Sequence, residues 1–167
     1  MWTEKASYWE YLALVVSSKL YQGFPKAEES LNEELLESSI PNVGRVYLKT
    51  HYANWLLETG RGNEAWKLWD EVILDGPNHR LTASAYYWKG LFQFNSGDFE
   101  KAKFLLTNVR ACLMPAPSLL SEWQLDAKAG IVLNRISAAT DLKRYDDDFI
   151  ERQKLAIKSD LRVSLLR

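Results

Sequence analysis

GRGNEA at residues 60–65 and GDFEKA at residues 97–102 repeat one pattern, 37 residues apart. In each stretch a glycine begins a short polar turn, and an alanine follows five residues after it. Glycine is favoured just past the end of a helix, and alanine suits places where two helix backbones approach closely. A helical unit of this length cannot bury its apolar face alone, so the repeat predicts units that stack on one another.

The rest of the chain reads as helices separated by breakers, with no convincing strand. Asn63 and Asp98 are predicted to cap the helices that follow Gly60 and Gly97, and prolines at 77, 115 and 117 are predicted to stop helices. Short linkers favour antiparallel neighbours. We expect seven or eight helices, near residues 3–21, 25–38, 44–59, 63–76, 81–96, 98–114, 118–138 and 144–166.

Large aromatic side chains are predicted to fill the gaps between helices. We assign Trp55, Trp69, Phe99 and Trp123 to the core, and expect Trp66 to be partly exposed. In the helix that begins at Ser118, apolar residues four apart are expected to share the packed face. These are Leu119, Trp123, Ala127 and Ile131.

Composition indicates one compact domain without a strong charge. The 167 residues are 47% hydrophobic, which argues against disorder. The formal net charge of -1 argues against a dedicated nucleic-acid binder. No stretch approaches the ~20 apolar residues of a membrane helix. One cysteine, Cys112, excludes an intrachain disulfide and favours a reducing compartment, so a cytoplasmic location is predicted.

The repeated positions resemble the tetratricopeptide repeat family. Its motif places a small residue at position 8, Gly at 15, Ala at 20, an aromatic at 24, a small residue at 27 and Pro at 32. The first unit matches with Ala53, Gly60, Ala65, Trp69, Val72 and Pro77, and the second with Gly90, Gly97, Ala102, Leu106, Val109 and, one place late, Pro115. Valine at position 27 and a 37-residue period, against the usual 34, are departures that we interpret as a longer turn between repeats.

The resemblance implies an all-α fold, a right-handed α-solenoid of antiparallel helix pairs. It implies one domain over residues 1–167, with clear repeats at about 46–79 and 83–115. Degenerate units are expected at about 8–41, around Gly23, and at about 118–166, around Gly130.

The resemblance also implies a partner-binding groove. In the family, positions 2, 5, 9, 12 and 13 of each first helix line a concave surface. Asn54 matches an asparagine that family members use to hold an extended peptide. The largely aromatic and uncharged lining suits an apolar peptide or a partner helix, or else the chain's own terminal helix, and both interpretations stay open. The ten positions are Tyr47, Thr50, Asn54, Leu57, Glu58, Ser84, Tyr87, Leu91, Phe94 and Asn95.

The sequence predicts no catalytic, cofactor or metal site. His51 and His79 lie far apart without a cysteine pair, Cys112 reads as a packing residue, and the acidic run 146–148 suits a helix start. We therefore predict a protein–protein interaction module or scaffold that is not an enzyme. The alternative is an enzyme-associated or regulatory helical domain with no recognisable active site of its own. Expected partners are a protein or peptide, or a second copy through exposed apolar helix faces, with no nucleic acid and no membrane.

Overall fold

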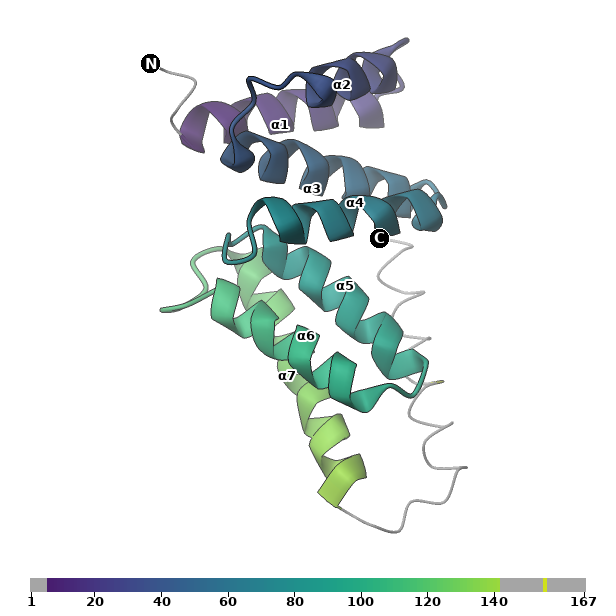
Figure 1. The fold of residues 1–167 in the computed structure, drawn as a ribbon, viewed down its shortest axis with the longest axis vertical. Coiled ribbons are helices and arrows are strands. Elements are labelled where there is room, and N and C mark those ends of the chain that lie inside the picture. The colour runs from purple at the N-terminus through teal and green to yellow at the C-terminus, as the bar shows by residue number, and fades with distance from the viewer. Residues whose placement is uncertain (1–5, 142–154, 156–167) are drawn as a thin grey trace. The chain divides into compact units, whose positions relative to one another are not determined.

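The computed structural model describes residues 6–141 and 155 and is all-α over them (Figure 1). The described residues form seven helices and no strand, which confirms the all-α prediction. The chain divides into two compact units, Met1–Ala85 and Tyr86–Arg167, here called unit 1 and unit 2. The helices are α1 (Ala6–Tyr21), α2 (Ala27–Leu36), α3 (Asn42–Glu58), α4 (Gly62–Asp75), α5 (Thr82–Asn95), α6 (Phe99–Cys112) and α7 (Leu120–Asp141).

Three helices end in the same glycine turn, at intervals of 37 residues. Gly23, Gly60 and Gly97 follow α1, α3 and α5 with φ of 67°, 83° and 83°, where a side chain would be strained. In each turn the next residue donates its amide to the carbonyl five positions back. The pairs are Phe24 to Lys19 at 3.0 Å, Arg61 to Leu56 at 2.7 Å, and Asp98 to Gln93 at 3.0 Å. The period seen in the sequence therefore extends back to Gly23.

Of the two predicted helix caps, one is confirmed and one is wrong. The Asp98 carboxylate accepts the amide of Lys101 at 3.2 Å, and hydrogen bonds from the Lys101 side chain and amide lower the pKa of Asp98. Asn63 is not a cap, because α4 begins at Gly62 and the N-cap is Arg61. The Arg61 carbonyl already accepts the Ala65 amide at 3.2 Å, so Asn63 lies within the first turn.

In unit 1, α3 packs against α1, α2 and α4. Ala53 and Ala65 are fully buried, as their predicted role at close helix contacts requires. Gly44 is a further close contact, because a Cβ there would lie 2.6 Å from the Trp9 ring. The core also holds Leu20, Leu31, Val46, Leu48, Tyr52, Leu56, Trp69 and Val72.

In unit 2, α6 packs against α7. Ala102, Leu106 and Val109 of α6 are fully buried, and a Cβ on Gly90 of α5 would meet Leu106 at 2.8 Å. On α7 the buried residues recur at helical spacing and are Ala129, Val132 and Ile136.

The predicted packed face of α7 is wrong. Leu119, Trp123 and Ile131 are 59%, 54% and 52% exposed, and Ala127 is also exposed. Trp123 precedes Ala129 by six residues, which at 100° per residue places it on another side of the helix. Trp69 is buried and Trp66 is half-buried, as predicted, whereas Trp55 and Phe99, which were assigned to the core, are only half-buried.

The end of the chain carries predictions that the structure does not address. The predicted last helix, residues 144–166, lies outside the described residues apart from Leu155, as does the acidic run 146–148. Among the described helices, none combines the length and apolar character that crossing a membrane requires.

Candidate partner-binding surface

The ten predicted groove residues come from two helices. Tyr47, Thr50, Asn54, Leu57 and Glu58 lie on α3, and Ser84, Tyr87, Leu91, Phe94 and Asn95 lie on α5. The α3 residues and Ser84 belong to unit 1, and the other four belong to unit 2.

In unit 2, three of the four groove residues are buried. Tyr87, Leu91 and Phe94 are 8%, 1% and 2% exposed, and the Phe94 ring packs on Phe99 of α6 with ring centroids 5.4 Å apart. A side chain with so little accessible surface contributes to packing in this conformation. Asn95 is half-buried, and its Oδ1 has no hydrogen-bond partner among the described residues.

The α3 residues keep more of their surface. Tyr47, Asn54 and Leu57 are half-buried, and Glu58 is exposed. Thr50 alone is buried, at 3% exposure. Asn54 follows Tyr47 by seven residues, and Leu57 and Glu58 follow Asn54 by three and four, so the accessible positions form one stripe along the helix.

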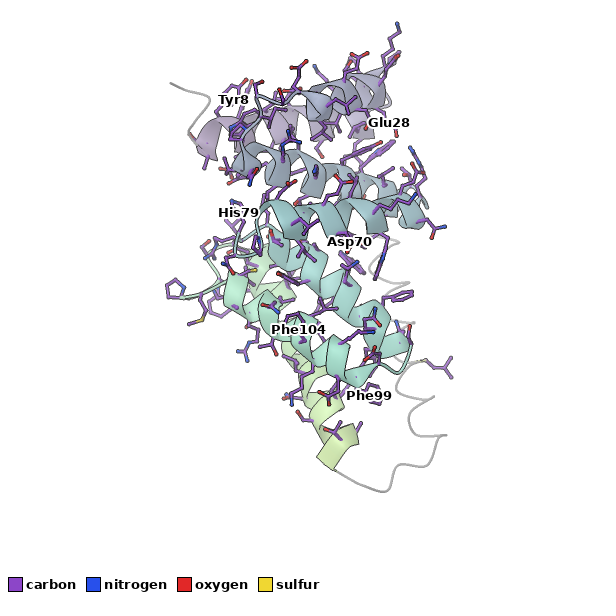
Figure 2. The ribbon with its side chains drawn as sticks, in the orientation of Figure 1. Tyr8, Glu28, Asp70, His79, Phe99 and Phe104 are labelled. Atoms are coloured by element: carbon purple, nitrogen blue, oxygen red, sulfur yellow. The ribbon has the colours of Figure 1, made fainter. Side chains whose placement is uncertain are left out.

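Tyr47 is held by the loop that follows α4. Its ring meets the His79 ring edge to face, with centroids 5.3 Å apart, and His79 is labelled in Figure 2. The Nδ1 of His79 accepts the Leu81 amide at 3.2 Å, which places the imidazole proton on Nε2. Burial lowers the pKa of His79, so the ring is neutral near pH 7. The neutral ring and the loop fix the position of Tyr47.

Helix α1 lies beside this stripe. Glu10 acts electrostatically on Tyr47 and His51, and Tyr21 hydrogen-bonds Glu58. Glu10 of α1 faces the first half of α3, and Tyr21, the last residue of α1, faces the last residue of α3, so the two helices run in the same direction. Leu14 follows Glu10 by one turn and precedes Tyr21 by two turns.

We call the accessible set the α1–α3 surface. Leu14 is 54% exposed and Tyr21 is 50% exposed. The surface consists of Glu10, Leu14 and Tyr21 on α1 and of Tyr47, Asn54, Leu57 and Glu58 on α3.

Electrostatics on the α1–α3 surface follow from its partial burial. Burial and the hydrogen bond to Glu58 raise the pKa of Tyr21, so its hydroxyl stays protonated as a donor. Burial lowers the pKa of His51, and the nearby Glu10 carboxylate offsets this lowering only in part. The imidazole is therefore neutral near pH 7. The carboxylates of Glu10 and Glu58 lie at opposite ends of the α1–α3 surface, with its apolar and aromatic residues between them.

The α1 half of the surface was missed by sequence reasoning, although the repeat contains the signal. Counting back 37 residues from Tyr47 and Glu58 gives Glu10 and Tyr21. Glu10 acts on Tyr47, and Tyr21 hydrogen-bonds Glu58, so both α1 residues interact with the groove position 37 residues after them. The period, applied to the groove positions as well as to the glycines, would have found them.

Unit 2 has an exposed apolar face of its own on α7. Trp123, Ala127 and Ile131 of α7, with Leu119 just before the helix, form this face, which we call the α7 stripe. Beside it lies a hollow of about 530 Å³ lined in part by Met114. An ion pair of 3.0 Å between Arg110 of α6 and Asp126 of α7 closes one side.

The described residues offer little for covalent or metal chemistry. No group of three or more His, Cys, Asp or Glu side chains within residues 6–141 is arranged to hold a metal ion. Burial raises the pKa of the Cys112 thiol to about 11, which leaves it protonated and weakly nucleophilic. The predicted packing role of Cys112 agrees with its burial.

Comparison with protein-family models, with curated proteins and with solved structures found no match.

Proposed function

We propose that the protein is a protein–protein interaction module whose α1–α3 surface binds a peptide or helix of a partner. The proposal includes the finer architecture expected from the sequence, antiparallel helix pairs stacked as a right-handed α-solenoid of the tetratricopeptide type. The glycine turns after α1, α3 and α5 support this repeat organisation. We also place the protein in the cytoplasm, because a single buried cysteine suits a reducing compartment.

One observation carries the proposal: exposed apolar residues of α1 lie beside the accessible groove residues of α3. Leu14 and Tyr21 present large apolar area, and Tyr47 adds a half-buried ring held by His79. Rigid aromatic side chains bind partners at low entropic cost. The Asn54 amide can both donate to and accept from a ligand's backbone.

Affinity capture with paired variants tests the proposal. The protein is used as bait in extract of its own cells, and captured proteins are identified by mass spectrometry. Leu14→Ala/Asn54→Ala alters the surface, while Leu74→Ala/Asn63→Ala makes the same two changes at exposed sites on α4. We expect the control to retain the partners of the wild type and the surface variant to lose them, with equal unfolding midpoints.

Two outcomes would contradict the proposal. If both variants retain the same proteins, the surface is not the binding site. If the surface variant instead loses several degrees of thermal midpoint and the control does not, the surface is packed within the chain. The second outcome would support the interpretation that the chain's own terminal helix fills the groove.

The α7 stripe supports a second proposal, association of two copies. Contiguous exposed apolar area is uncommon on monomers and marks interaction surfaces. Trp123→Lys/Ile131→Lys should convert a concentration-dependent dimer to a monomer in sedimentation equilibrium. A wild-type chain that stays monomeric at all concentrations would contradict this second proposal.

A further inference from the structure

Unit 1 contains a hollow whose lining differs in chemistry from the α1–α3 surface. Its volume is about 670 Å³, and it opens where the end of α1, the following turn, α2 and α3 meet. Leu20 and Trp55 form an apolar floor, and Phe24 and Leu36 stand at the edges with 53% and 84% exposure. The remaining lining residues are Gly23, Lys26, Ala27, Glu28, Glu29, Asn32 and Glu33.

One wall of the hollow is acidic. Helix α2 carries four glutamates and no lysine or arginine, and three of these glutamates line the hollow. Glu29, Asn32, Glu33 and Leu36 recur at helical spacing, so they share one face. Glu29 and Glu33 are exposed and form no ion pair among the described residues. Lys26 is the one basic residue in the lining of the hollow, against the three glutamates, so the hollow presents net negative charge next to apolar surface.

The base of that wall is held in place by Glu28. Its Oε1 accepts the Tyr52 hydroxyl at 2.5 Å and pairs with the Arg61 guanidinium at 2.7 Å, and Glu28 is labelled in Figure 2. Arg61 also pairs with Glu64 at 2.6 Å and lies 5.7 Å from the Trp55 ring centroid. These contacts join α2, α3 and α4, so the floor and the wall are formed before a ligand arrives.

We propose that this hollow binds a basic amphipathic segment of a partner protein. The aliphatic stem of a lysine or arginine lies on Trp55 and Leu20, and its cationic head reaches Glu29 and Glu33. An apolar neighbour of that cation packs between Phe24 and Leu36. Charge complementarity selects the occupant, because the acidic wall repels anionic membranes and nucleic acids.

This surface is independent of the α1–α3 surface proposed above. Leu14 and Asn54 do not line the hollow. Failure of one proposal is therefore distinguishable from failure of the other, since each has its own variants.

A labelled peptide tests the proposal on the full chain. The probe is a short fluorescein-labelled helix former with leucine and tryptophan on one face and lysine and arginine on the other. A matched peptide carries glutamate at every basic position, and an oligolysine has equal charge without apolar residues. Fluorescence anisotropy is followed at about 0.15 M salt, where exposed charges more than about 8 Å apart are largely screened.

The key variant is Glu29→Lys/Glu33→Lys, and its control is Glu37→Lys/Glu100→Lys. The control makes the same change in net charge at exposed glutamates outside the hollow. We expect the basic amphipathic peptide to bind the wild type and the control equally and to lose at least about tenfold in affinity for the key variant. Leu36→Ala should also weaken binding without lowering the thermal midpoint, because Leu36 is 84% exposed.

Three results would overturn the proposal. Equal affinity of the key variant and its control would show that the acidic wall does not bind the peptide. Equal binding of oligolysine and the amphipathic peptide would show charge attraction without use of the hollow. A dimer in sedimentation equilibrium that the key variant alone disrupts would assign the hollow to a second copy of the chain.

Discussion

Gly44→Ala should destabilise the protein by pushing α1 away from α3, which together form the proposed surface. A Cβ at residue 44 would lie 2.6, 2.7 and 2.8 Å from three carbon atoms of the Trp9 ring. Ordinary carbon contacts are about 3.5–4.0 Å, so the ring or the helix must move by about 1 Å. Trp9 is only 5% exposed and its ring is rigid, so little space is available for that movement.

The expected magnitude combines two opposing effects. Overpacking of a buried contact costs about 1–3 kcal/mol. Alanine in place of glycine within a helix returns about 1 kcal/mol of helix propensity. Because three ring atoms are involved, we expect a net loss of about 1–2 kcal/mol in the free energy of unfolding.

Urea denaturation followed by circular dichroism measures the effect, with Gly62→Ala as the matched control. Gly62 begins α4, and a Cβ there meets nothing within 4 Å. The control should therefore be stabilised by about 0.4–1 kcal/mol, mainly through the unfolded chain. Adding Trp9→Leu to Gly44→Ala should relieve the clash and give a coupling energy of about 1 kcal/mol in a double-mutant cycle. Equal midpoints for the two glycine variants, or no coupling, would refute the α1–α3 packing described here.

Three further predictions follow from the described contacts. Ala102→Leu should lower the free energy of unfolding by about 1–3 kcal/mol, because Ala102 is fully buried. Lys101→Leu, at an exposed site, should change the urea midpoint little. Equal losses for the two variants would show that Ala102 does not lie at a close helix contact. The pKa values of His51 and His79 are lowered in the folded state, so stability is full above the unfolded value of 6.5 and falls as pH drops below it. Each histidine changes the free energy of unfolding by at most about 1.4 kcal/mol per pH unit. The double variant His51→Gln/His79→Gln should therefore flatten the dependence of this free energy on pH between about pH 7.5 and 5.5. An unchanged pH dependence would contradict burial of the histidines as its cause. Metal analysis of protein purified without chelator should return no stoichiometric zinc, iron or manganese, and one tightly held ion per chain would contradict the prediction that the chain has no metal site.

The all-α fold class and most helix ends could be predicted from the sequence because local chemistry determines them. Gly60 and Gly97 end helices through a backbone conformation that other residues adopt with strain, and Asp98 caps α6 with its own carboxylate. Both signals act over a few residues. The cap at α4 was predicted wrongly because residues 61–63 offer several starting points, and the preference of Asn63 for capping did not decide between them.

The orientation of α7 could not be predicted because two apolar stripes compete on that helix. Leu119, Trp123 and Ile131 form the more apolar stripe, yet Ala129, Val132 and Ile136 are the buried ones. Which stripe is buried is decided by the packing of α7 against α6, a tertiary effect that periodicity does not report. The same limit applies to the candidate site: spacing placed Tyr47 and Asn54 on one face of α3, but the burial of Leu91 and Phe94 depends on their packing.

The acidic hollow escaped sequence reasoning for a related reason. Its floor and wall come from Leu20, Glu29 and Trp55, which lie on three different helices. No local pattern connects them. The acidic composition of α2 was visible in the sequence, whereas its apolar neighbours became evident only from the packing of α1 and α3.

Site-specific photo-crosslinking tests most directly whether the α1–α3 surface binds a partner. A benzophenone amino acid is placed at Leu14, on the surface, or at Leu74, an exposed site on α4, and the protein is irradiated in extract of its own cells. We expect a discrete crosslinked partner from position 14 that is absent from position 74 and is lost when Asn54→Ala is added. No crosslink at position 14, or the same products from both positions, would contradict it.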